Sequence, residues 1–371
     1  MKKITCLTLA AVALASAPLA QAQLTMTPMA TFSPNNDGWL APSEGGYGFL
    51  GIANLERGMA YGNGELYLVS RNGGNSVRRL SSTTGAEVGT LAGASGLLVG
   101  TFGVNKVGVS TDGTIYVANL VSSASAAGSP FRVYSWANPA ATPITNYSGA
   151  PINAARIGDS TLAVSGTGAG TRLATGFTGS VTNNGYGIVD PTAGTTTAVG
   201  FVGTPPVLGD FRLGLTFGTA GQVWGNQGSQ TLRETSFSGA AGTLLGTATG
   251  LVSIAERPMS FATVNGLNIL ATISTGDSFV RVYDASNPLV LALLGSGNNT
   301  LGALTANGNA TGDVAWGAQT DNGNGTTTVQ LYTLSSNQGI QAFNVVVPEP
   351  ATGALVGVGL SALVAFRRSR K

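Results

Sequence analysis

The chain has 371 residues, of which 55 are glycine and only 9% are charged, and it contains one cysteine and no histidine. The absence of histidine excludes Ser-His-Asp and Cys-His catalysis and every site in which histidine binds zinc, copper or iron. The chain combines 43% hydrophobic residues with a net charge of only +2. Disordered chains show the opposite combination, so this composition indicates a folded protein.

The first 22 residues have the three regions of a secretory signal peptide. Lys2 and Lys3 precede an apolar stretch at 4–17, and Ala20 and Ala22 are the small residues that signal peptidase needs before its cleavage site. We therefore expect signal peptidase to cleave after Ala22 during export through the inner membrane.

The last 25 residues combine three features in a fixed order. Pro348, Glu349 and Pro350 form a segment that can join neither a helix nor a central strand, because each proline fixes φ and lacks a backbone donor. The uncharged stretch 351–366 would form a helix of about 24 Å, shorter than the ~30 Å hydrocarbon core of a membrane. The chain then ends on a basic tip formed by Arg367, Arg368, Arg370 and Lys371.

This order resembles the PEP-CTERM sorting signal of Gram-negative bacteria. The resemblance implies that the membrane protease exosortase processes the tail, and that 351–366 contacts the membrane only transiently. The basic tip is expected to stay on the cytoplasmic side. A permanent single-helix anchor is the alternative, which the short and glycine-rich stretch disfavours. The expected destination is the cell surface or the extracellular matrix.

The two terminal segments carry six of the 18 basic residues, so they determine the sign of the net charge. Between residues 23 and 347 the chain has 12 basic and 15 acidic residues, a net charge of −3. Nucleic-acid binding requires a clustered basic face, so no nucleic-acid partner is expected. The single cysteine, Cys6, lies in the signal peptide, and the mature chain therefore forms no disulfide.

Residues 23–346 are expected to form one all-β domain between the signal peptide (1–22) and the sorting tail (347–371). Short apolar strands such as 65–70 and 114–118 follow turns rich in Gly, Asn or Asp, and second and third strands follow each of them. Repeats of about 40 to 50 residues with several antiparallel strands are typical of a β-propeller.

We expect a propeller of about six blades, or seven if the segment 24–55 contains another one. The last repeat lacks a closing strand, because 341–347 runs directly into the Pro-Glu-Pro segment. The stretch 24–32 is expected to supply this strand and so to leave no open sheet edge.

The dipeptide Glu56-Arg57 recurs as Glu256-Arg257, 200 residues further along the chain. The first strand of a propeller blade begins near the central channel, so all four residues are candidates for facing a ligand. Arginine beside carboxylate suits acidic or hydroxyl-rich sugars. The alternative is that these residues form ion pairs between neighbouring blades. The opening at Glu56, with the strand that follows it, also resembles a secreted propeller-type domain of unknown function, which implies no activity.

Two segments rich in Asp and Asn, 35–38 and 321–325, offer oxygen atoms of the kind that calcium binds. Neither has the spacing of an EF-hand, and such clusters more often form turns. We therefore expect no cofactor, and the sequence does not support a calcium site.

These features predict an exported, exosortase-sorted surface or matrix protein with a non-catalytic propeller body. The resemblance of the tail implies an association with exopolysaccharide or biofilm matrix. The alternative is a secreted propeller enzyme, a carboxylate-dependent polysaccharide lyase or hydrolase. The acidic residues are scattered and form no recognisable catalytic pair, so we expect no enzymatic activity.

Overall fold

A computed structural model of the protein describes residues 23–178, 184–201, 209, 211–227, 231–287 and 289–349. The expected signal peptide and the stretch 351–366 lie outside these residues. The described part consists of strands, turns and a few short 3-10 helices, and it contains no α-helix. None of its helices has the length and apolar character needed to cross a membrane.

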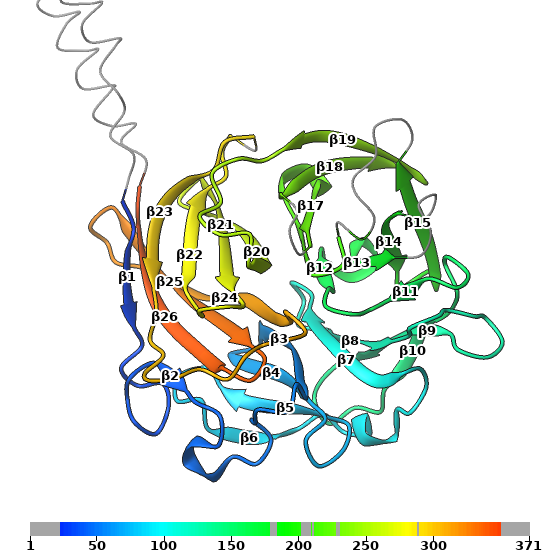
Figure 1. Cartoon of the computed structure of the whole chain (residues 1–371), viewed down its shortest axis with the longest axis horizontal. Helices are drawn as coiled ribbons and strands as arrows, with labels where there is room; N and C mark the ends of the chain where they lie inside the picture. The colour runs from blue at the N-terminus through cyan, green and yellow to red at the C-terminus, as the bar shows by residue number, and fades with distance from the viewer. Residues whose placement is uncertain are drawn as a thin grey trace, which may run out of the picture.

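The strands form five sheets around a common centre (Figure 1). Three of these sheets are four-stranded meanders in which each strand is antiparallel to the next. The first contains β3 (Glu56–Gly62), β4 (Glu65–Ser70), β5 (Ser76–Ser81) and β6 (Glu87–Thr90). The second contains β7 (Phe102–Val109), β8 (Ile115–Leu120), β9 (Phe131–Trp136) and β10 (Ile144–Gly149). The third contains β20 (Glu256–Val264), β21 (Leu267–Ser274), β22 (Val280–Asp284) and β23 (Ala292–Gly297).

The fourth sheet has nine strands and consists of two meanders joined at their outer edges. The first meander contains β11 (Arg156–Ile157), β12 (Ala163–Ser165), β13 (Arg172–Thr178), β14 (Asn184–Asp190) and β15 (Thr195–Phe201). The second contains β16 (Gly214–Phe217), β17 (Val223–Asn226), β18 (Arg233–Ser238) and β19 (Ala241–Thr247). Among the described residues, the backbones of the two meanders pair along a short parallel stretch in which Gly200 and Phe201 lie opposite Ala241 and Gly242.

The fifth sheet joins the two ends of the body. It contains β24 (Gly312–Asp321), β25 (Thr326–Ser335), β26 (Gly339–Pro348), β1 (Thr25–Pro28) and β2 (Trp39–Leu40). Strand β1 is antiparallel to β26, with Thr25 opposite Val346, which confirms the expected closing strand. The strands of the segment 24–55 therefore join this last sheet rather than form a sheet of their own.

The hairpin turns follow from residues that tolerate positive φ. Asn63 and Gly64 connect β3 to β4 with φ of 55° and 77°, and Asn265 and Gly266 connect β20 to β21 with φ of 51° and 73°. Two-residue turns with positive φ at both positions match the twist of a β-hairpin, and Asn-Gly is their preferred sequence. The repeat seen in the sequence thus builds the same hairpin twice.

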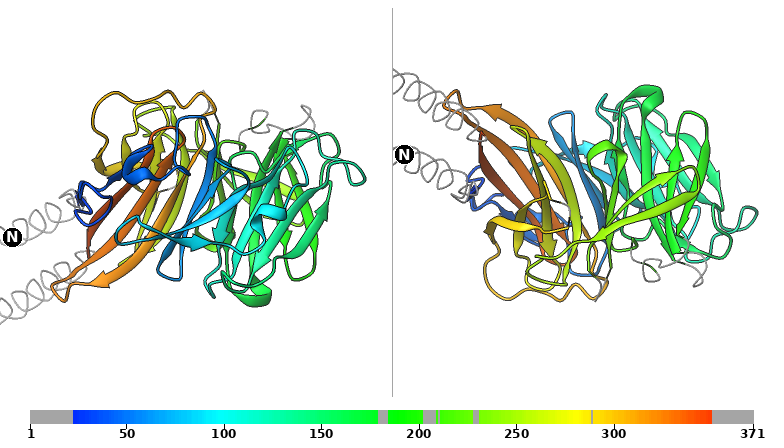
Figure 2. Two further views of the ribbon diagram at one scale, coloured as in Figure 1. Left: turned by 90° about the horizontal axis from the view of Figure 1, so that it is seen from below. Right: turned by 90° about the horizontal axis from the view of Figure 1, so that it is seen from above.

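The innermost strands surround the centre of the molecule. They are β3, β7, β12, β16, β20 and β24, and each packs against the next, with β24 returning to β3. Together they line a central channel of about 460 Å³. This all-β, β-propeller-like arrangement agrees with the expected fold class. Seen from the side, β1 and β26 lie together at one edge (Figure 2).

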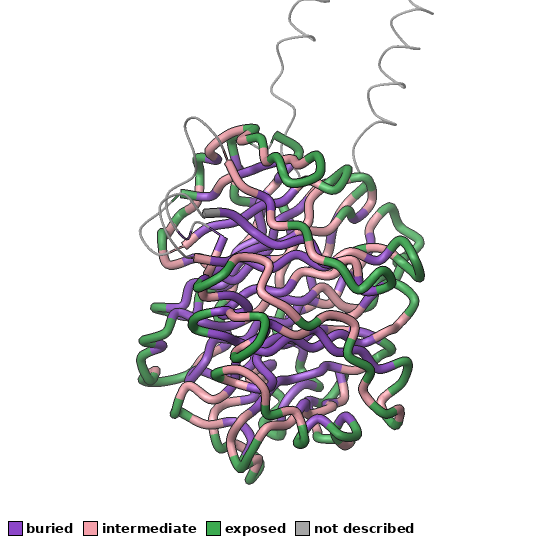
Figure 3. Tube along the Cα trace, turned by 90° about the vertical axis from the view of Figure 1, so that its right-hand side faces the viewer, coloured by how far each residue is buried: buried purple, intermediate pink, exposed green. Residues whose placement is uncertain are grey.

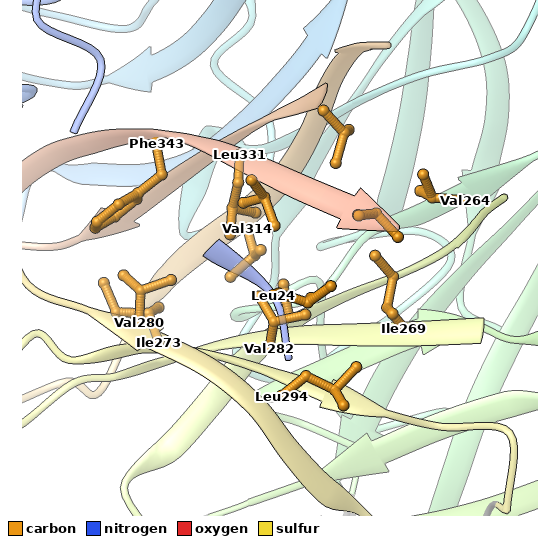
Figure 4. Close-up of a cluster of buried hydrophobic side chains, with 14 residues drawn as sticks. Leu24, Val264, Ile269, Ile273, Val280, Val282, Leu294, Val314, Leu331 and Phe343 are labelled. Atoms are coloured by element: carbon orange, nitrogen blue, oxygen red, sulfur yellow. The ribbon is translucent and has the colours of Figure 1, made fainter. Parts of the chain in front are cut away.

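The hydrophobic core lies between the faces of adjacent sheets. One cluster fills the space between the β20–β23 sheet and the last sheet, where Leu24 packs among Val282, Leu294 and Leu331 (Figure 4). The backbone N–H of Leu24 also donates to the carbonyl of Leu294 at 3.1 Å. Buried residues follow the strands and exposed residues gather in the connecting turns (Figure 3).

Candidate functional site

The two Glu-Arg dipeptides lie at the start of innermost strands, as expected from the repeat. The strand register shifts between Glu56 and Gly58 in β3, and between Glu256 and Met259 in β20. A β-bulge of this kind bends the strand and changes the direction of the side chain that it carries. Arg57 and Arg257 thus occupy equivalent irregular positions.

Glu256 is fully buried, and its carboxylate is completely engaged inside the fold. One oxygen accepts from the Ser253 N–H at 2.9 Å and from Arg281 Nη1 at 3.0 Å, and the other accepts from Thr272 Oγ1 and Tyr283 Oη, each at 2.7 Å. The partners belong to the same sheet or to the loop that precedes it. This geometry favours the structural interpretation of Glu256.

Glu56 is also buried, but only half of its carboxyl group is engaged. Its Oε1 accepts from the Gly51 N–H at 3.1 Å, whereas Oε2 has no hydrogen-bond partner among the described residues. Burial raises the pKa of Glu56, and backbone donors and the charge of Arg71 offset only part of this effect. The two glutamates of the repeat therefore have different environments.

Arg57 pairs with an aspartate from another sheet. Its Nη2 lies 3.1 Å from Asp159 Oδ1, and Asp159 follows β11 in the nine-stranded sheet. The same carboxylate binds Arg156 and Arg212, each at 2.9 Å. Burial opposes the ionisation of Asp159, but the three arginines outweigh it and hold the pKa of this carboxyl below its ordinary value. An ion pair between sheets thus exists, with Asp159 rather than a glutamate of the repeat.

The three arginines and Asp159 line a pocket of about 500 Å³. It lies at the end of the channel where β3 begins. Arg57 precedes Met59, and Arg212 precedes Leu215, and both of these apolar residues line the channel. The side chains that carry charge in the pocket are Arg57, Arg71, Arg156, Arg212 and Asp159. Four positive charges and one negative charge give these lining groups a net charge of +3. We call this site the arginine pocket.

Arg71 is the arginine of this pocket that does not pair with Asp159. Its guanidinium carbon lies 3.5 Å from the ring centroid of Phe102, and its Nη2 donates to the carbonyl of Asn54 at 3.1 Å. Its Nε and Nη1 have no partner among the described residues, and neither does Nε of Arg57. Burial, together with the charge of Arg57, lowers the pKa of Arg71 to about 10. Arg71 is therefore protonated at neutral pH.

Arg257 lies close enough to Arg212 for their charges to repel each other, but it does not line the arginine pocket. Burial lowers the pKa of Arg257, and the repulsion from Arg212 lowers it further to a smaller extent. Of the four candidate residues in the Glu-Arg repeat, only Arg57 lines the pocket.

Lys106 connects three innermost strands near the same end of the channel. It is fully buried in β7, and its Nζ donates to the carbonyls of Arg57 in β3 and Gly312 in β24 at 3.2 and 2.9 Å. It also forms an ion pair with Asp313 Oδ2 at 2.5 Å. Burial lowers the pKa of Lys106 and raises that of Asp313. This pair holds the centre of the fold together.

The two segments considered for calcium form turns. Asp321 Oδ1 accepts from the Gly323 N–H at 2.8 Å, and Asp37 Oδ1 accepts from Ser33 Oγ and the Trp39 N–H at the same distance. Within the described ranges, no three acidic residues cluster in a way that would hold a metal ion. These carboxylates thus accept hydrogen bonds from groups in their own turns, as asparagine and aspartate side chains commonly do.

The sorting segment begins at the last residue of β26, beyond the point where β1 pairs with it, so Pro348 does not lie in a part of the sheet that pairs on both sides. Pro348 ends β26 opposite Thr326, and the N–H of Glu349 donates to the carbonyl of Gly325 at 2.8 Å. Proline is tolerated there because the neighbouring β1 begins its pairing at Val346, so no partner requires the missing N–H. Pro350, Ala20, Ala22 and the basic tip lie outside the described residues.

Sequence reasoning missed most of the arginine pocket. Arg71, Arg156, Asp159 and Arg212 come from three different repeats and share no recurring motif. The one available signal was the recurrence of Glu-Arg, which identified Arg57 alone.

Comparison with known proteins agrees with the interpretation of the tail. Residues 346–371 match the PEP-CTERM protein-sorting motif. No curated protein matches the chain in sequence. The motif implies that exosortase processes the protein and that it is exported to the cell surface or the extracellular space.

Solved structures similar to this chain include a DUF4623 family protein from Bacteroides eggerthii, with 15% sequence identity and a TM-score of 0.59. The match covers 80% of this chain and 71% of that one. The lectin of Aleuria aurantia, a six-bladed β-propeller, is 11% identical over 81% of this chain and 97% of its own, with a TM-score of 0.46. The gluconolactonase XC5397 of Xanthomonas campestris is 12% identical over 78% and 86%, also at 0.46. The first similarity shows the fold alone, and the other two are too low to support an argument.

The chain is therefore an exported protein with a β-propeller-like body and a C-terminal PEP-CTERM sorting motif.

Proposed function

We propose that the protein is a non-catalytic, six-bladed propeller that binds extracellular polysaccharide at the cell surface or in the biofilm matrix. The sorting motif supports its location outside the cell. The arginine pocket carries the binding part of the proposal, because it is a concave site with more cationic than anionic groups. Arginine forms strong, directional hydrogen bonds with the oxygen atoms of acidic sugars.

The count of six blades treats the nine-stranded sheet as two blades. Among the described residues, the outer strands of its two meanders pair through two residues on each side, which is a small contact. Each meander has its own innermost strand, β12 in one and β16 in the other. Together with the other four sheets, this makes six repeats around the channel.

The carboxyl groups of the site support a non-catalytic role. Polysaccharide hydrolases commonly use two carboxyl groups that flank the bond to be cleaved. The arginine pocket contains one carboxylate, Asp159, which three arginines keep ionised. Glu256 is saturated with hydrogen bonds inside its own sheet.

One observation favours the alternative of a propeller enzyme. Glu56 is a buried carboxyl group with a raised pKa and one free oxygen, which are properties of a general acid. It does not line the arginine pocket, however, and the channel lining does not include it. We therefore retain binding as the proposed function.

A single incubation separates the two functions. The purified protein is mixed with exopolysaccharide from the producing cells, and both co-sedimentation and polymer chain length are measured. Binding without chain shortening is the expected result. Chain shortening that Glu56→Gln or Glu256→Gln abolishes would show that the protein is an enzyme instead.

A further inference from the structure

We infer that the arginine pocket binds the carboxylate of a hexuronate residue in an acidic polysaccharide, with Arg57, Arg71 and Arg212 around the bound group. This inference rests on the proposed function and names the chemistry of its ligand. It follows from the charge balance of the pocket, its unused donors and its size.

Among the described residues, the side chains that line the pocket carry three more positive than negative charges. Arg57, Arg156 and Arg212 share the single carboxylate of Asp159, and no carboxylate lies within ion-pair distance of Arg71 among the described residues. Glu56 lies close enough to Arg71 for their charges to interact, but it forms no ion pair with Arg71 and does not line the pocket. Burying a charge without a partner is costly, so an anion at this position would stabilise the site.

Unused donors accompany this excess charge. Nε and Nη1 of Arg71 and Nε of Arg57 are buried atoms that donate to no described group. Native proteins rarely leave buried donors without acceptors, because each one loses its hydrogen bonds to water. A carboxylate has two oxygens that can each accept several such bonds, and arginine recognises it by matching geometry.

The dimensions of the pocket fit a sugar residue better than a lone inorganic anion. The cavity of about 500 Å³ lies in the range typical of pockets for small organic ligands. Arg57 and Asp159 form its buried floor, whereas Ala53, Thr101 and Asn309 are exposed at its rim. A polymer can therefore place one acidic residue on the floor while the rest of the chain continues into solvent.

Titration calorimetry on the full chain in mild detergent tests this inference. The ligand is an oligogalacturonate of defined length, and its control is the same oligosaccharide with the carboxyl groups reduced to alcohols. We expect the acidic form to bind and the reduced form not to bind. Affinity should stay constant between pH 6 and 9 and fall as the pH rises through about 10, where Arg71 loses its proton.

Three variants locate the binding site. Arg71→Met and Arg212→Gln should each weaken the binding of oligogalacturonate by roughly ten- to a hundredfold, as expected for the loss of one or two charge-assisted hydrogen bonds. Arg172→Gln is the matched control, because Arg172 pairs with Asp190 on a different, exposed part of the body. This variant should bind like the unmodified chain.

Folding is controlled separately, because Arg71 also packs against Phe102. Arg71→Lys keeps the charge but loses the planar donors, and it should bind with intermediate affinity at an unchanged melting temperature. If Arg71→Met unfolds, Arg71→Lys and Arg212→Gln decide the result.

The outcomes distinguish this inference from the proposed function. Equal binding of the acidic and reduced oligosaccharides, or normal binding by the pocket variants, would overturn the inference. A tighter interaction with inorganic sulfate than with the oligogalacturonate would assign the pocket to a free anion and would also overturn it. Failure of the unmodified protein to bind any exopolysaccharide would refute the proposed function itself.

Discussion

At the residue scale, several of the few cationic side chains of the body have specific structural positions. It has 12 basic residues, and four of them line the arginine pocket. Another, Lys106, is completely buried and joins the backbones of β3 and β24 to Asp313. A buried pair of this kind makes a modest net contribution to stability, but removal of one partner leaves the other charge without compensation.

Lys106→Met should therefore destabilise the fold by about 3 to 5 kcal/mol, because Asp313 loses its only ion-pair partner among the described residues. The double variant Lys106→Met with Asp313→Asn should recover part of this loss, since it removes the uncompensated charge. Urea unfolding of both variants measures the free energies. Arg78→Gln is the control, because its partly exposed pair with Glu87 should contribute less than about 1 kcal/mol. A Lys106→Met variant as stable as this control would argue against the structural role.

At the element scale, β1 closes the molecule. It occupies the edge of β26, which would otherwise expose a row of unpaired backbone groups. Leu24, just before β1, fills the core between the last sheet and the β20–β23 sheet. The strand thus contributes both backbone pairing and apolar packing.

Deletion of residues 24–33 should collapse the fold, and Leu24→Ala alone should cost about 2 to 5 kcal/mol, as for other buried leucines. Thr25→Ala is the matched control on the same element, because the Thr25 side chain is exposed. Thermal unfolding followed by circular dichroism gives the comparison. An unchanged melting temperature in the deletion variant would refute the closing role of β1.

At the scale of the whole molecule, the pairing of β1 with β26 brings the two ends of the body together. Thr25 lies opposite Val346, so the chain enters and leaves the body at one edge (Figure 2). The sorting motif starts at this edge without an intervening linker, since Pro348 is the last residue of β26. The sorting motif therefore leaves the body beside the strand at which the described chain enters it.

Replacement of Pro348 and Glu349 by alanine should prevent processing of the tail while the body stays folded. The reason is that the motif lies at the end of β26, where few contacts depend on these side chains. Mass spectrometry of the exported protein measures whether the C-terminal residues are removed. Substitution of the exposed Thr25 by alanine should leave processing unchanged. A shortened product from the Pro348 and Glu349 variant would show that this motif does not direct processing.

Much of the fold was predictable because it depends on local sequence. The turn at Asn63 and Gly64, the strands beside it and the closing strand before Phe32 follow from residue preferences and from the need to pair strand edges. The position of Pro348 was not predictable, because its tolerance depends on where β1 begins to pair. The arginine pocket was also not predictable, because Arg57 and Asp159, which form an ion pair, are 102 residues apart in the sequence.

The sequence alone therefore determined the destination of this protein and its β-propeller-like class. Both depend on residues that are close together in the sequence. The destination follows from the ordered motif of the tail, and the class follows from the local preferences of strand and turn residues. Only the tertiary structure decided which side chains form the candidate site. Closure of the innermost strands into a ring brings Arg57 and Arg71 of one repeat together with Arg212 of another at one end of the channel. The repulsion among these arginines, and the burial of the unused donors of Arg57 and Arg71, exist only in the folded protein.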